Sequence, residues 1–292
     1  TIMKKPTSYN YTLSVGVCIK NESSYIIDFM KHYIEQGIEH FYIVNNNSDD
    51  NIEELIENSK YKDLVTLIHD NRNIDIINAY SSSTDGLINI INDNLYDIMK
   101  AETEWAIIVD IDEFMYGKNG YNIKSFLKSI SHNIGCIYVI WNIMTVSNIN
   151  DGFNNSFSTK SNNFKRLNYD MISNVSQNIR SANDFGKSIF RTSMLTGKIG
   201  LHKTHCTAGI IINNYGENKN SWYDNCNNIE YSENNFKNVN ITLDHYVIRT
   251  KDDYNIKKKQ HEICNSNRNV LLNGVFELFQ LDDVYLINNK LN

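Results

Sequence analysis

Strand-like and helix-like patterns alternate through the first 110 residues, and this alternation restricts the fold more than any other feature of the chain. Apolar runs rich in β-branched residues predict four strands, at 11–19, 40–44, 64–69 and 104–110. Amphipathic patterns predict the helices between them, at 26–34, 52–59 and 76–100. Strands that alternate with helices favour a mostly parallel sheet with helices on its faces. The sequence therefore predicts an α/β fold.

Polar residues follow the first, second and fourth predicted strands. They are Lys20-Asn21-Glu22, the segment 45–50 and Asp110-Ile111-Asp112. Because the carboxyl ends of parallel strands share one edge, where open α/β sheets bind ligands, we expect these loops to lie close together. Two carboxylates such as Asp110 and Asp112 at a strand end can bind one divalent cation, which neutralises phosphate oxygens. The same short pattern also occurs in exposed acidic turns.

The second half of the chain loses the alternation after an apolar run at 135–141. Residues 145–185 and 213–240 are polar and irregular, which indicates surface excursions, and 251–260 predicts a helix. Neither a linker-like composition nor an internal repeat is visible. The sequence therefore predicts a single domain over residues 1–292.

Charge and composition exclude several classes of protein. The chain has 34 acidic and 28 basic residues, a net charge of −6, which argues against a dedicated nucleic-acid binder. The sequence contains no apolar run of about 18 residues and therefore predicts no membrane span. We expect a soluble, cytoplasmic protein. Five dispersed cysteines without a CxxC pair argue against a zinc ribbon and a disulfide framework. Abundant asparagine and a single proline indicate an AT-rich genome, of a virus or a low-GC microbe, so single asparagines carry little functional signal.

Three ordered motifs resemble glycosyltransferase family 92. They are Lys20-Asn21-Glu22, the segment 34–51 (IEQGIEHFYIVNNNSDDN) and the segment 104–114 (EWAIIVDIDEF). The stretches 187–191 (KSIFR), 200–202 (GLH) and 245–246 (HY) resemble the family more loosely. The resemblance implies a Rossmann-like GT-A fold related to glycosyltransferase family 2. It assigns about 11–115 to a nucleotide-sugar-binding half, about 135–260 to an acceptor-side half, and 261–292 to a C-terminal covering segment.

The resemblance implies a metal-dependent hexosyltransferase. Such an enzyme moves a sugar from a nucleoside diphosphate sugar, with a UDP-sugar as the default donor, to a hydroxyl of a glycan, a protein or a small molecule. It implies inversion at the anomeric carbon and a Mn²⁺ or Mg²⁺ ion. The residues that resemble donor-binding positions are Lys20, Asn21, Glu22, Asn46, Asp50, Asp110, Ile111, Asp112, Lys187 and Arg191. Those that resemble metal ligands are Asp110, Asp112 and one late histidine, either His202 or His245.

Ordinary structural roles remain open for many of these residues. Asn21 and Asp50 are also typical helix caps, and Lys187 and Arg191 could lie on a solvated edge. The chain departs from the family pattern at Asn45, where aspartate is usual, and at Thr192, where proline is usual. The second departure lies on the acceptor side, so the resemblance does not identify the acceptor.

An inverting transfer also requires a general base, a carboxylate within hydrogen-bond reach of the acceptor hydroxyl. The segment well after Asp110-Ile111-Asp112 contains Asp184, Asp151 and Asp170. We expect Asp184 to be the general base and take Asp151 as the second candidate. Two alternatives use the same acidic motif or the same fold. One is a metal-dependent phosphoesterase, and the other is a catalytically silent carbohydrate- or nucleotide-binding GT-A domain. The sequence leaves the oligomeric state open, and a homo-oligomer is one option.

Overall fold

The computed structural model describes residues 8–72, 86–146, 164–166, 185–212, 240–250, 252–253 and 256. The chain divides into two compact units. The first comprises residues up to 140 together with 186–214 and 220–243, and the second comprises 141–185, 215–219 and 244–292. The prediction of one domain over 1–292 stays a prediction.

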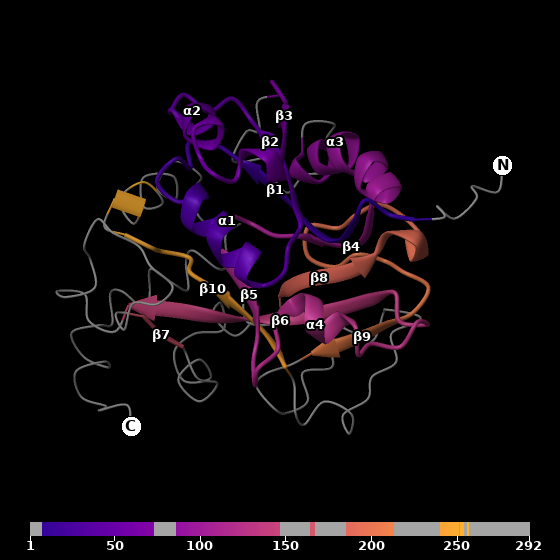
Figure 1. The fold of residues 1–292 in the computed structure, drawn as a ribbon. Helices are drawn as coiled ribbons and strands as arrows, with labels where there is room; N and C mark the ends of the chain where they lie inside the picture. Colours follow the sequence, from indigo (N-terminus) through magenta and orange to yellow (C-terminus); the bar gives the residue numbers. More distant parts are fainter. Residues whose placement is uncertain are drawn as a thin grey trace, which may run out of the picture. The chain divides into compact units, whose positions relative to one another are not determined.

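Four parallel strands form the N-terminal part of the sheet in the first unit (Figure 1). They are β1 (Tyr11–Ile19), β2 (His40–Asn45), β3 (Val65–His69) and β4 (Thr103–Ile108), in the order β3-β2-β1-β4. Ile19 pairs with Asn45, and Asn45 pairs with His69, so these strands end level with one another. Gly16 of β1 pairs with Ile108, the last residue of β4. All four strands therefore present their carboxyl ends at one edge, as predicted.

Helices connect these strands. They are α1 (Ile26–Glu35), α2 (Ile52–Glu57) with the 3₁₀ turn η1 (Lys62–Leu64), and α3 (Leu87–Glu102). The chain leaves α1 through Gly37, whose φ of 87° lies in the left-handed region that glycine adopts readily. The helix predicted from residue 76 is described only from Leu87; residues 73–85 lie outside the described part. The predicted α/β fold is confirmed.

The rest of the sheet is mixed. Its elements are β5 (Glu113–Gly117), α4 (Ile123–Leu127), β6 (Cys136–Val146), β7 (Phe164–Arg166), β8 (Gly186–Arg191), the 3₁₀ turn η2 (Thr192–Met194), β9 (Gly209–Ile212) and β10 (Ile241–His245). The strand order is β3-β2-β1-β4-β8-β6-β10-β5, and β7 and β9 also pair with β6. Strand β8 runs antiparallel to both β4 and β6. The parallel arrangement predicted from the alternation therefore holds for its N-terminal part.

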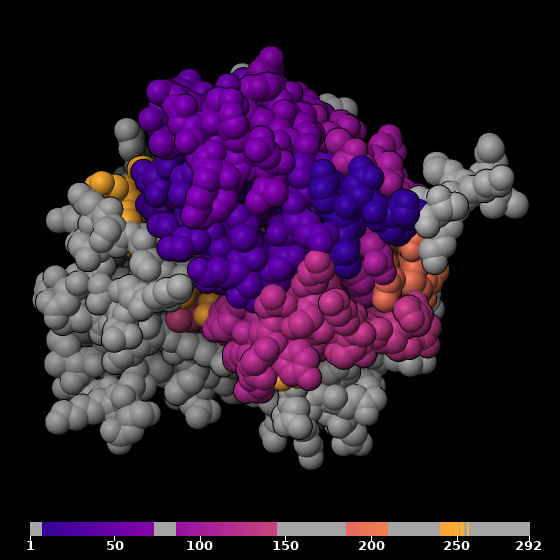
Figure 2. Space-filling model, in the orientation of Figure 1, coloured from indigo at the N-terminus to yellow at the C-terminus, as the bar shows by residue number. Residues whose placement is uncertain are grey.

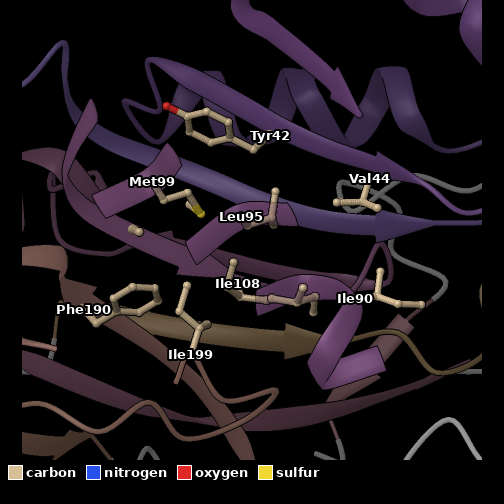
Figure 3. Packing of buried hydrophobic residues seen from close by; sticks show 10 residues of the cluster. Tyr42, Val44, Ile90, Leu95, Met99, Ile108, Phe190 and Ile199 are labelled. Atoms are coloured by element: carbon tan, nitrogen blue, oxygen red, sulfur yellow. The ribbon is translucent and has the colours of Figure 1, made fainter. Parts of the chain in front are cut away.

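One hydrophobic cluster joins α3 to the sheet of the first unit (Figure 3). Its buried members are Tyr42, Val44, Ile90, Ile91, Leu95, Met99, Ala106, Ile108, Phe190 and Ile199. Gly16 permits the close approach, because a Cβ atom there would lie 2.5 Å from Ile108 Cδ1 and 2.8 Å from Leu95 Cδ1. Burial of each large side chain stabilises the fold by about 1.5–3 kcal/mol. The helix thus holds β1 and β4, whose ends carry candidate loops, in fixed register.

On the face of the first unit drawn in Figure 2, residues 8–72 (indigo to violet) lie beside residues 86–140 (purple to magenta).

In the second unit, the end of β6 pairs with β7 through Met144 and Arg166. Asn142 Nδ2 donates to Asp244 Oδ1 at 2.7 Å. Residues 252, 253 and 256 are helical, within the helix predicted at 251–260. None of the helices in the described ranges is long and apolar enough to cross a membrane.

Candidate functional site

The loops that follow β1 and β2 are joined by hydrogen bonds. Asn21 N donates to Ser48 Oγ at 3.0 Å, and Asp49 N donates to Asn21 Oδ1 at 2.7 Å. Ser23 N donates to Asp50 Oδ2 at 2.8 Å. The structure therefore brings together Asn21 and Asp50, as the shared sheet edge predicted. It also gives both side chains a structural role in holding the two loops.

Asn46 links the second loop to the loop that follows β3. Its side chain is buried, and its Nδ2 donates to the carbonyl oxygens of Asp70 at 2.9 Å and Arg72 at 2.7 Å. Arg72 in turn forms ion pairs with Asp70 at 2.5 Å and Asp93 at 2.7 Å. The hydrogen bonds from the Arg72 guanidinium lower the pKa of Asp70 to about 2. This third loop was not identified from the sequence, although it follows a parallel strand just as the other loops do.

The acidic motif forms a tight turn after β4. Asp110 O accepts from Glu113 N at 3.1 Å, and Asp110 N donates to Glu113 Oε2 at 2.9 Å. Glu113 is fully buried, whereas 47% of the Asp110 side chain is exposed. Asp112 is half-buried, and Ile111 is buried. The turn therefore presents two partly exposed carboxylates, Asp110 and Asp112, and keeps a third one inside.

Lys187 of β8 lies beneath this turn. Its Nζ donates to Asp110 Oδ2 at 2.8 Å and to Leu201 O at 2.9 Å, and lies 3.3 Å from Glu113 Oε2. Burial by itself would lower the pKa of Lys187, but Asp110 and Glu113 more than offset this effect and raise it. The lysine therefore stays charged although only 1% of it is exposed.

Cys18 lies near the carboxyl end of β1, and its thiol is largely buried. Burial, with a smaller contribution from the negative charges of Asp110 and Asp70, raises the pKa of its thiol to about 12. Cys18 is on β1, between β2 and β4. The ends of all four parallel strands lie along this one edge of the sheet.

Hydrogen bonds hold the segment 199–206 against α3 and β8. Asn92 of α3 bonds both backbone groups of Ile199, each at 2.8 Å. Ser188 Oγ donates to His202 O and accepts from Thr204 N, both at 3.0 Å. His202 Nδ1 lies 3.2 Å from Gly186 O, where a protonated Nδ1 donates to the carbonyl.

Comparison with protein families adds one decisive match. The sequence model of glycosyltransferase family 92 matches residues 13–207, which include all four loops and the segment 199–206. The chain belongs to glycosyltransferase family 92. A comparison with curated proteins gave no match.

Three solved structures show weaker similarity to this family 92 protein. TarS of S. aureus is 18% identical, with 62% of this chain and 28% of TarS covered and a TM-score of 0.37. Its fragment 1–349 is 13% identical, with 96% and 75% covered and a TM-score of 0.39. Glucosyl-3-phosphoglycerate synthase of Mycobacterium tuberculosis, solved with Mn²⁺, UDP and phosphoglyceric acid, is 10% identical, with 63% and 57% covered and a TM-score of 0.31. The chain thus spans about a quarter of full-length TarS, and these scores carry no weight for its function.

The family 92 motifs do not all reach the same edge of the sheet. Arg191 pairs with Trp105 near the amino end of β4, and its guanidinium lies over the Trp105 ring at 4.1 Å. It also forms an ion pair with Glu104 and donates from Nε to Ile134 O at 3.1 Å. Because Asp110 follows the opposite end of β4, the structure does not bring Arg191 to the acidic turn.

The remaining family 92 candidates lie elsewhere. Lys20 is exposed and Glu22 half-buried in the first loop. His245 belongs to the second unit, where its ring lies 4.4 Å from that of Trp141. Asp184, Asp151 and Asp170 fall outside the described residues. Within the described ranges, no cluster of three or more His, Cys, Asp or Glu side chains could hold a metal by itself.

Proposed function

We propose that this family 92 protein transfers a hexose from a nucleoside diphosphate sugar, a UDP-sugar by default, to a hydroxyl of a glycan, a protein or a small molecule, with inversion. Membership of a glycosyltransferase family supports the reaction class. The observation that carries the proposal is that three polar loops and the acidic turn at 110–113 follow parallel strands whose carboxyl ends share one edge of the sheet. Such an edge is where open α/β sheets bind nucleotides.

The donor set fits a hard divalent cation, Mn²⁺ or Mg²⁺. Asp110 and Asp112 offer partly exposed carboxylate oxygens, which such cations prefer. Asp110 Oδ2 already accepts from Lys187, so we assign the direct metal contact to Asp112 and the supporting one to Asp110. The two carboxylates leave room for phosphate oxygens of the donor as further ligands. When bound, the cation would neutralise negative charge on the leaving diphosphate.

His202 is the better of the two histidine candidates for this metal. Its Nδ1 lies 3.2 Å from the carbonyl oxygen of Gly186, and a hydrogen bond from one ring nitrogen to a backbone carbonyl is usual for metal-ligating histidines. Its segment is also joined to the acidic turn, because Leu201 O and Asp110 Oδ2 accept from the same ammonium.

The loops after β1 and β2 would bind the base and ribose. Lys20, Asn21, Glu22 and Asp50 are the residues we assign there; the first two are exposed and the others half-buried. Asn46 would act indirectly, because its buried amide holds the third loop in place. Asp184 and Asp151 stay the proposed general bases.

The test measures how far UDP raises the melting temperature of the protein, once in the presence of Mn²⁺ and once in the presence of EDTA. A ligand at 100 times its Kd stabilises a protein by about 2.7 kcal/mol, which corresponds to on the order of 5–10 °C for a chain of this size. We expect this rise with Mn²⁺ and little rise with EDTA, because two carboxylates repel a diphosphate unless a cation lies between them.

Asp112→Asn should abolish the Mn²⁺-dependent rise and the transfer reaction. Asp97→Asn, which changes an exposed carboxylate on α3, is the matched control and should keep both. Equal stabilisation by UDP in EDTA, or an Asp112→Asn protein that responds normally, would refute the proposal. Hydrolysis of the donor to UMP and a sugar 1-phosphate without any acceptor would instead favour the phosphoesterase alternative.

A further inference from the structure

Lys187 has a complete set of protein partners. Its ammonium is buried and contacts Asp110 Oδ2 at 2.8 Å, Leu201 O at 2.9 Å and Glu113 Oε2 at 3.3 Å. A lysine ammonium has three N–H donors and no acceptor. Three acceptors therefore satisfy all its donors, and no donor remains for a phosphate. This differs from the phosphate-binding role that the sequence motif suggested for Lys187.

The contacts of Lys187 join parts of the chain that are far apart in sequence. Asp110 is 77 residues away, in the turn after β4, and Leu201 is 14 residues away, in the segment that carries His202. Ser188, the next residue of β8, binds the same segment through His202 O and Thr204 N. Strand β8 thus fixes the acidic turn and the histidine segment with respect to each other.

The charges explain why a lysine suits this position. Two carboxylates, Asp110 and Glu113, lie within reach of one ammonium, and Glu113 is fully buried. A neutral residue at 187 would leave these carboxylates facing each other without a cation. The Asp110 side chain, which is 47% exposed, would then lose the partner that holds its Oδ2.

We propose that Lys187 is a positioning residue of the donor site: it orients the Asp110 carboxylate without binding the diphosphate itself. This inference rests on the proposed function, because it requires that Asp110 take part in donor binding. A lysine that acts through Asp110 has no separate effect once Asp110 has been changed.

A double-mutant cycle tests this dependence. The proteins are wild type, Lys187→Met, Asp110→Asn and the double variant, and the measurement is the Kd for UDP with Mn²⁺ by calorimetry, together with kcat and KM for the donor. We expect each single variant to weaken UDP binding by about tenfold or more, and the double variant to bind no more weakly than Asp110→Asn alone. Lys198→Met, which changes an exposed lysine bonded to Asn89, is the control and should bind UDP normally.

Two results would overturn the proposal. If the losses multiply in the double variant, Lys187 contributes independently of Asp110, as a direct phosphate ligand would. If Lys187→Met binds UDP like wild type, the residue positions nothing of importance.

Lys187→Met leaves Glu113 buried without a cation. If this variant does not fold, the same cycle is measured in a Glu113→Gln background, where that charge is absent. A wild-type protein that binds no UDP refutes the proposed function instead. In that case the melting temperatures of the same four proteins are compared. If the single variants lower the melting temperature by amounts that add up in the double variant, the contact between Lys187 and Asp110 is refuted.

Discussion

Asn92 is the residue through which α3 holds the segment that carries His202. Only 8% of it is exposed; its Nδ2 donates to Ile199 O and its Oδ1 accepts from Ile199 N, each at 2.8 Å. Ile199 is fully buried, so water cannot replace these hydrogen bonds. The substitution Asn92→Leu keeps a side chain of similar size and removes both bonds.

The expected cost follows from the two backbone groups left without a partner. A buried donor or acceptor that loses its hydrogen bond costs about 1–3 kcal/mol. The N–H and C=O of Ile199 together therefore cost roughly 2–6 kcal/mol, a large part of the 5–15 kcal/mol typical of a folded domain. The melting temperature should fall by on the order of 10 °C.

The assay is urea unfolding, with Asn89→Leu as the matched control on the same helix. Asn89 Oδ1 accepts from Lys198 Nζ at 3.2 Å in an exposed contact to the same segment, so its loss should cost no more than about 0.5 kcal/mol. An Asn92→Leu protein as stable as Asn89→Leu would show that the buried amide does not hold the segment.

Two further predictions concern the ends of the site. His202→Ala should lower the affinity of the UDP complex for Mn²⁺, measured by titration, much more than His245→Ala does. Equal and mild decreases in both variants would mean that both histidines are structural. Arg72 holds the pKa of Asp70 at about 2, below its usual value, so this pairing stabilises the fold above the unfolded pKa of about 3.9 and is lost as the pH falls through about 2. The melting temperature of wild type should therefore exceed that of Asp70→Asn at about pH 5, and this difference should shrink as the pH falls to about 2. A difference that does not change with pH would show that the Asp70 carboxylate does not stabilise the fold through its charge.

The parallel half of the fold was predictable because its signals are local. Each buried strand is a short apolar run, and each helix carries an apolar stripe that faces the sheet. The prediction that the loops after β1 and β2 meet needed only the rule that parallel strands end at one edge, and the bonds of Asn21 confirm it. The same rule applied to β3 would have found Asp70 and Arg72.

The placement of β8 could not be predicted, because its pairing is between residues far apart in sequence. The motif KSIFR suggested one phosphate-binding role for Lys187 and Arg191. Four residues of a strand span about 13 Å, and the antiparallel pairing with β4 puts Arg191 beside Trp105, near the start of β4. Lys187 instead reaches Asp110 beyond its end. The antiparallel direction of β8, which cannot be deduced from the motif, therefore places Lys187 and Arg191 near opposite ends of β4.

Asparagine takes the place of glycine in several turns of this chain. The three non-glycine residues with positive φ in the described part are all asparagines, Asn21, Asn47 and Asn119, with φ of 58°, 53° and 55°. The left-handed conformation costs an ordinary residue about 1 kcal/mol, but asparagine offers hydrogen bonds in return, as Asn119 does to Asn240 at 3.1 Å. An unfolded chain explores fewer backbone conformations at asparagine than at glycine. With only 13 glycines in 292 residues, this protein therefore loses less backbone entropy at such turns when it folds.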